Sequence, residues 1–173
     1  MSAYMSLPKK GKGAGIVVLQ EIFGVNESMR KVCDFLAMRQ FTAICPDLFW
    51  RAEPGVELKE SEADRGRALR GKMNDDQVTD DIASAMDFLR KHPACTGGVG
   101  VVGYCWGGML AYLTAVRHKP DAAVIDVQPQ QQNRPRDAKV EETPAAKEVG
   151  KPLELEDLDV DIPTFLRRQK QNG

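Results

Sequence analysis

The segment 103–108 reads GYCWGG and places a cysteine between two glycines. An apolar run precedes it and further apolar residues follow it, so the pattern predicts a strand, a sharp turn and a helix. At such a turn a side chain at Gly103 or Gly107 would collide with neighbouring backbone, while the residue at the apex presents its reactive atom. Cys105 is therefore a candidate nucleophile. The alternative is a buried, unreactive thiol, because free cysteine is often buried.

A second apolar run, residues 14–19, ends in the loop 20–26, which carries the acid Glu21 among apolar side chains. In hydrolases that use such a turn, a loop of this kind supplies one backbone amide to the oxyanion, and the residue after the nucleophile supplies the other. We therefore expect the amides of Ile22 and Trp106 to bind the oxyanion. Glu21 is either a functional acid at this site or an ordinary loop carboxylate.

The segments between these blocks alternate in pattern and predict the elements that position them. Residues 27–38 and 75–91 have the spacing of amphipathic helices, and residues 41–45 and 121–125 read as strands. Alternation of this kind predicts an α/β fold with a doubly wound, mainly parallel sheet of about four recognisable strands. Its site lies at the carboxyl ends of the strands, where Glu21 and Cys105 both fall.

Three blocks, residues 20–26, 45–49 and 103–108, resemble in order and spacing the dienelactone hydrolases, or carboxymethylenebutenolidases. The resemblance implies a cytosolic α/β-hydrolase that attacks a lactone or ester carbonyl through a cysteine nucleophile, here Cys105. It also implies that Glu21 contacts the resting thiol and helps to activate it when substrate binds.

The same family has an arginine after the Cys-Pro-Asp-Leu block that holds the carboxylate of the substrate. The charged segment 63–70 occupies that region and offers Arg65 or Arg67, between which the sequence does not choose. The alternative for both is a solvated helix face, which is the usual position of clustered charges.

The family's triad also needs an aspartate and a histidine from loops after later strands, and the resemblance ends near Asp126. The sequence has two histidines. His92 precedes a proline at a helix end, and His118 lies about 20 Å from Cys105 along the helix that begins there. We therefore expect neither to be the general base and expect impaired turnover. A partner chain that supplies the missing half is the alternative.

The segment 127–173 differs in composition from the preceding residues. Residues 127–158 are polar and proline-rich and predict a disordered linker. Residues 159–173 form a short peptide that is similar to the C-terminal tail of FtsZ, the tubulin-like bacterial cell-division protein. That resemblance implies a protein partner held by a set of anchors and arginines: Ile162, Pro163, Phe165, Leu166, Arg167 and Arg168.

Two resemblances that meet near residue 126 leave two alternatives to an enzyme. One is a non-enzymatic interaction protein that works through the FtsZ-like peptide, and the other is a chimeric gene model. A sheet cut at this point would expose an apolar edge and face. We expect marginal stability or self-association of the folded domain, residues 1–126.

Composition excludes several other classes. The formal net charge is −1, from 24 Lys and Arg against 25 Asp and Glu, so neither nucleic acid nor a membrane is an expected partner. The four cysteines lack the spacing of metal ligands or of a disulfide framework, and no nucleotide-binding motif is present. We expect no metal and no cofactor. Free thiols and the absence of a signal-like apolar segment predict a cytoplasmic protein.

Overall fold

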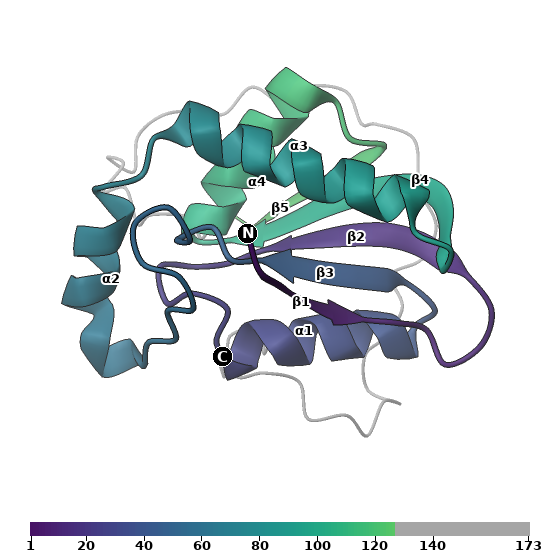
Figure 1. Cartoon of the computed structure of the whole chain (residues 1–173), viewed down its shortest axis with the longest axis horizontal. Helices are drawn as coiled ribbons and strands as arrows, with labels where there is room; N and C mark the ends of the chain where they lie inside the picture. Colours follow the sequence, from purple (N-terminus) through teal and green to yellow (C-terminus); the bar gives the residue numbers. More distant parts are fainter. Residues whose placement is uncertain (127–173) are drawn as a thin grey trace, which may run out of the picture. The chain divides into compact units, whose positions relative to one another are not determined.

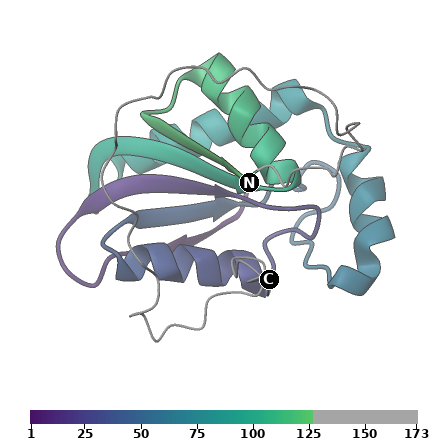
Figure 2. The same ribbon diagram turned by 180° about the vertical axis from the view of Figure 1, so that it is seen from behind.

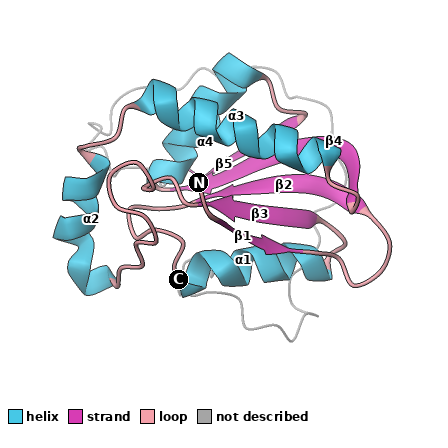
Figure 3. Ribbon diagram, in the orientation of Figure 1, coloured by secondary structure: helices cyan, strands magenta, loops and turns pink. Residues whose placement is uncertain are grey.

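The computed structural model describes residues 1–126, which form a five-stranded sheet with helices on both faces (Figures 1–3). The strand order across the sheet is β1-β3-β2-β4-β5. The elements, in chain order, are β1 (Ala3–Ser6), β2 (Gly13–Leu19), α1 (Glu27–Met38), β3 (Thr42–Pro46), a short 3₁₀ helix (Glu60–Glu62), α2 (Ala63–Arg70), α3 (Asp75–Lys91), β4 (Cys95–Tyr104), α4 (Trp106–His118) and β5 (Ala122–Asp126).

The sheet is mainly parallel, and its register brings the ends of β2 and β4 together. β2 pairs in parallel with β3 and with β4, and β4 pairs in parallel with β5, whereas β1 is antiparallel to β3. Leu19 at the end of β2 is opposite Gly103. Because parallel strands end at one edge, the loops after β2 and β4 leave the sheet side by side.

The helices bury opposite faces of the sheet. α1 packs on one face through Met29, Val32 and Cys33, while α3 and α4 cover the other face with residues such as Ile82 and Leu110 (Figure 1). Asparagine side chains cap the starts of two of these helices. The Oδ1 of Asn26 accepts a hydrogen bond from Met29 N at 3.1 Å, and that of Asn74 accepts from the amides of residues 76 and 77.

The fold confirms the predicted α/β architecture and corrects the number of strands. The prediction of about four strands missed β1, which is only four residues long and pairs as an antiparallel edge strand. Its sequence, AYMS, has no run of β-branched residues, so its pairing with β3 and not its own pattern makes it a strand. The predicted linker, residues 127–158, and the FtsZ-like peptide, residues 159–173, lie outside the described residues and stay predictions.

Candidate functional site

Cys105 lies at the apex of a strained turn between β4 and α4. Its φ of 53° and ψ of −118° fall outside the regions that L residues usually adopt. The side chain is exposed, whereas Cys33, Cys45 and Cys95 are buried. The alternative of a buried thiol at position 105 is therefore wrong.

The two glycines of the turn are required by close backbone contacts. A Cβ built on Gly103 would lie 1.9 Å from the carbonyl oxygen of Gly107, and one on Gly107 would lie 2.4 Å from that of Leu19. Neither position admits a side chain. The predicted collision is thus confirmed, and the second contact also presses the start of α4 against the end of β2.

The three sequence blocks converge through one hydrogen bond and one aromatic stacking contact. Gln20 is buried, and its Oε1 accepts a hydrogen bond from Leu48 N at 3.0 Å, which ties the loop after β2 to the segment after β3. The adjacent Phe49 stacks on Trp106, with ring centroids 5.2 Å apart and an interplanar angle of 15°. Trp106 directly follows Cys105, so these contacts place the three blocks next to one another beside the turn.

The first amides of α4 are oriented toward the same edge as Cys105. The Cys105 carbonyl accepts hydrogen bonds from the amides of Gly108 and Met109 at 3.1 and 3.3 Å. The amide of Trp106 therefore precedes the first bonds of the helix, and amides at this position are free to bind an anion. Ile22 lies in the turn after β2, at the same edge of the sheet.

Glu21 is a half-buried carboxyl in the loop directly after Gln20. Burial raises its pKa above the ordinary value, and the nearby charge of Glu60 raises that pKa further. A carboxyl of this kind accepts a proton more readily than an exposed one.

Arg65 and Arg67 lie on the exposed side of α2. Arg65 forms ion pairs with Glu53 and Glu62, and Arg67 pairs with Asp64 at 2.6 Å. Gly66, between them, faces inward, since a Cβ there would lie 2.4 Å from the Ile22 carbonyl oxygen. Both arginines are thus bound to surface acids, as the solvated-face alternative expects.

Arg70 is the arginine of α2 that lies against the Trp106 ring, and it was not among the arginines predicted from the sequence. Its guanidinium carbon lies 5.3 Å from the centroid of the Trp106 ring, and Asp75 pairs with it at 3.0 Å. The side chain is 28% exposed. Helical spacing was the available signal, because Arg70 follows Gly66 by four residues and so shares its inward face.

Neither histidine lies at the edge that carries Cys105. His92 lies shortly before Cys95, the first residue of β4, and so at the end of that strand opposite to Cys105. Its Nδ1 accepts a hydrogen bond from Ala94 N. His118 is the last residue of α4, with its Nε2 3.5 Å from an oxygen of Asp80. These positions agree with the expectation that neither histidine serves Cys105.

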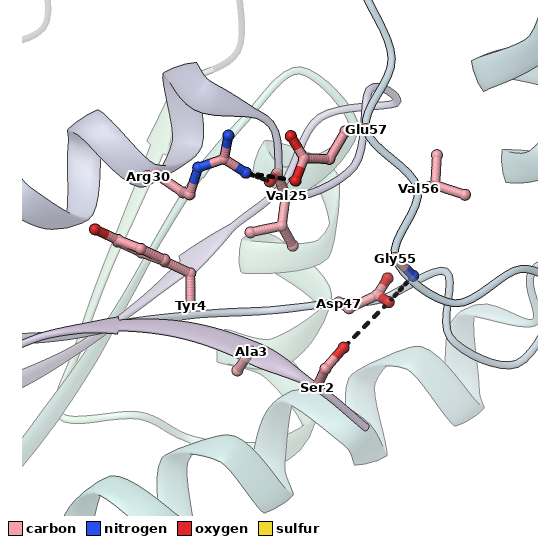
Figure 4. A pocket seen from close by; sticks show the side chains of 9 residues that line it. All are labelled: Ser2, Ala3, Tyr4, Val25, Arg30, Asp47, Gly55, Val56 and Glu57. Atoms are coloured by element: carbon pink, nitrogen blue, oxygen red, sulfur yellow. Dashed lines mark hydrogen bonds and ion pairs between the residues drawn. The ribbon is translucent and has the colours of Figure 1, made fainter.

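A separate cavity of about 210 Å³ opens near the carboxyl end of β3 and is lined by neither Glu21 nor Cys105 (Figure 4). Its charged groups are already paired. Arg30 donates to Glu57 at 2.6 Å and to the Val25 carbonyl, and Asp47 accepts from Gly55 N at 2.8 Å. Because neither Glu21 nor Cys105 lines this cavity, it is not the candidate site.

Residues 1–126 contain no cluster of three or more side chains suited to hold a metal ion. Within the same part of the chain, no helix is both long and apolar enough to cross a membrane.

Comparison with known proteins agrees with this arrangement. The sequence model of the "Dienelactone hydrolase family" matches residues 1–150. A carboxymethylenebutenolidase of Pseudomonas sp. (strain P51) is 44% identical over 117 residues, which are 65% of this chain and 49% of that protein. Carboxymethylenebutenolidase 1 of Cupriavidus pinatubonensis is 34% identical over 125 residues, which cover 70% of this chain and 53% of the relative.

The fold is also similar to that of solved structures. A Klebsiella pneumoniae protein provisionally assigned as a dienelactone hydrolase matches with a TM-score of 0.57 and 31% identity, over 66% of this chain and 48% of that one. The chain therefore spans about half the length of the curated relatives it matches.

Proposed function

The chain belongs to the dienelactone hydrolase family, and from that premise we propose that it attacks the carbonyl carbon of a lactone or ester through the thiol of Cys105. The observation that carries the proposal is the exposed cysteine at a strained turn whose neighbouring glycines admit no side chain. A sulfur atom held in this way stays exposed and is accessible to a substrate.

The proposed first step transfers a proton and forms one bond. The Cys105 proton passes to the Glu21 carboxylate, and the thiolate sulfur adds to the carbonyl carbon. The amides of Ile22 and Trp106 then hydrogen-bond to the oxyanion, which stabilises the charge that develops in the transition state. The raised pKa of Glu21 supports its role as the proton acceptor.

The second step breaks the bond from carbon to the leaving oxygen and leaves a thioester on Cys105. The leaving oxygen takes the proton from Glu21, so the atoms and charges balance. Release of the acyl group requires an activated water. Because His92 and His118 lie away from this edge of the sheet, we propose that acylation is fast and that hydrolysis of the thioester is slow.

Arg70 is proposed to orient substrates that carry an anionic group. Its half-buried guanidinium lies over Trp106, next to the residue that carries the thiol. Replacing it with Met keeps much of the aliphatic volume and removes the charge. We expect Arg70→Met to lower the rate of acylation by an anionic aryl ester about fivefold and to leave a neutral ester within about twofold, since a partly screened ionic contact contributes about 1 kcal/mol.

Arg65→Met is the matched control on the same helix, because its partners Glu53 and Glu62 are surface acids. Equal effects of the two substitutions, or a loss at Arg65 alone, would contradict the assignment to Arg70.

The proposed acylation is tested by stopped-flow release of p-nitrophenol from p-nitrophenyl acetate. The chain is expected to release about one equivalent in a burst and then to turn over slowly. Cys105→Ala removes the burst, and Cys45→Ala, at a buried thiol, retains it. Sustained release that is equal in the Cys105→Ala variant would refute the proposal.

A cytoplasmic location also remains a proposal, supported by the four free thiols among the described residues.

A further inference from the structure

Gly66 lies inside α2, a position at which glycine is unfavourable. α2 has eight residues, and Gly66 and Leu69 are its buried ones. Glycine within a helix costs about 1 kcal/mol relative to alanine. Gly66 is not among the residues with positive φ, so its backbone conformation does not call for glycine either. The requirement for glycine at this position is therefore one of space.

The backbone of Ile22 occupies that space. A Cβ on Gly66 would lie 2.4 Å from the carbonyl oxygen of Ile22 and 3.2 Å from its carbonyl carbon. α2 lies beside the loops at the carboxyl ends of the parallel strands (Figures 1 and 3). Because the contact is made by backbone atoms, no change of side-chain rotamer could relieve a clash. With any larger residue at position 66, either the helix or the loop must move.

Other contacts hold this loop on either side of Ile22. The amide of Leu58 donates to the Phe23 carbonyl at 2.9 Å, and the Gln20 carbonyl oxygen lies 2.8 Å from where a Cβ on Gly107 would be. Within residues 1–126, neither the amide nor the carbonyl of Ile22 itself takes part in a hydrogen bond. Packing against Gly66 therefore supports the backbone of Ile22 where hydrogen bonds do not.

We propose that Gly66 is a positioning residue for the oxyanion, because it lets α2 support Ile22 so that the amide of this residue faces the reacting carbonyl. The inference rests on the proposed function, in which that amide binds the oxyanion. The amide and the carbonyl of Ile22 are attached to the same Cα, so a displacement of one moves the other. A displacement of 1 Å at a group that stabilises a transition state can lower the rate about a hundredfold.

Two reactions of Cys105 separate this role from a general effect on the thiol. Attack on p-nitrophenyl acetate forms an oxyanion, whereas attack on iodoacetamide displaces iodide from a saturated carbon and forms none. We expect Gly66→Ala to lower the rate of the p-nitrophenol burst at least about tenfold. Alkylation of Cys105, followed by mass spectrometry, should stay within about twofold of the wild-type rate. The ester is neutral, so a shift of Arg70 does not enter the comparison.

Gly71→Ala is the matched control at the end of the same helix. A Cβ there would lie 3.5 Å from the nearest atoms, which is an ordinary contact, and its φ of −63° suits alanine. Both rates should stay within about twofold.

Leu69→Ala is a second variant that disturbs the same helix without added bulk. Leu69 is 3% exposed and belongs to the main core, so its truncation loosens α2 from the core. It should lower the burst rate at least about threefold and spare the alkylation of Cys105. This variant carries the test if circular dichroism shows that Gly66→Ala does not fold.

Parallel loss of acylation and alkylation in both α2 variants would mean that α2 supports the whole turn and not the oxyanion amide, and would overturn the proposal. Equal burst rates in Gly66→Ala and Gly71→Ala would overturn it as well. A wild-type chain that gives no burst would overturn both this inference and the proposed function. A wild-type burst that the folded Gly66→Ala variant leaves unchanged would overturn only the role of Gly66.

Discussion

The turn around Cys105 and the contact between α1 and β3 hold thiols in opposite environments. Cys105 is exposed at positive φ, whereas Cys33 and Cys45 are buried together in the apolar layer beneath α1. A hydrogen bond with Cys33 and complete burial raise the pKa of Cys45 well above its ordinary value. Backbone position, and not residue type, therefore decides which cysteine of this chain is available for chemistry.

Alkylation should separate these two groups of thiols most strongly. With iodoacetamide under native conditions, Cys105 should react about a thousandfold faster than the three buried cysteines, because their modification requires a local opening of about 4 kcal/mol. Mass spectrometry of digested samples taken over time measures each site. Comparable rates at Cys45 and Cys105 would remove the contrast between the two environments.

Gly103→Ala should break the turn and not the α1 contact. The added Cβ would lie 1.9 Å from a carbonyl oxygen that belongs to the backbone, so the free energy of unfolding should fall by about 3 kcal/mol or more. Urea denaturation followed by circular dichroism measures the loss. Gly98→Ala, where a Cβ meets nothing within 4 Å, is the control and should change stability by less than about 0.5 kcal/mol. Equal stability of the two variants would show that the turn is not held as described.

The sequence predicted the turn better than it predicted the arginine. The glycines around Cys105 mark backbone contacts that depend on local geometry, so their spacing was enough to predict the turn. α3 was likewise predicted at residues 75–91, because its apolar period is a local signal. Arg70 and Phe49 both contact the ring of Trp106, which is distant from them in sequence. Only the packing of α2 and of the segment after β3 brings their side chains to that ring.

A substitution at Glu21 should change stability less than Gly103→Ala does. Its raised pKa means that the folded protein is favoured when this group is protonated, so the contribution to stability is present below the unfolded pKa of about 4.3 and is lost as pH rises through the folded pKa. Glu21→Gln should therefore raise Tm at pH 7 by a few degrees, the shift that about 1 kcal/mol produces in a domain of this size.

The gain at Glu21→Gln should shrink toward pH 4, where the wild-type carboxyl is protonated. Thermal melts between pH 4 and pH 8 measure both variants. A gain that is constant across this range would mean that burial of the charged carboxylate is not its cause.

The identity of the acylated atom decides whether Cys105 is the nucleophile. The chain is mixed with p-nitrophenyl acetate, quenched in acid within seconds, digested and analysed by mass spectrometry. We expect one acetyl group, on the peptide that contains Cys105, and none in the Cys105→Ala variant. An acetyl group on Cys33, Cys45 or Cys95, or release of p-nitrophenol with no acyl group on any cysteine, would contradict the assignment of Cys105 as the nucleophile.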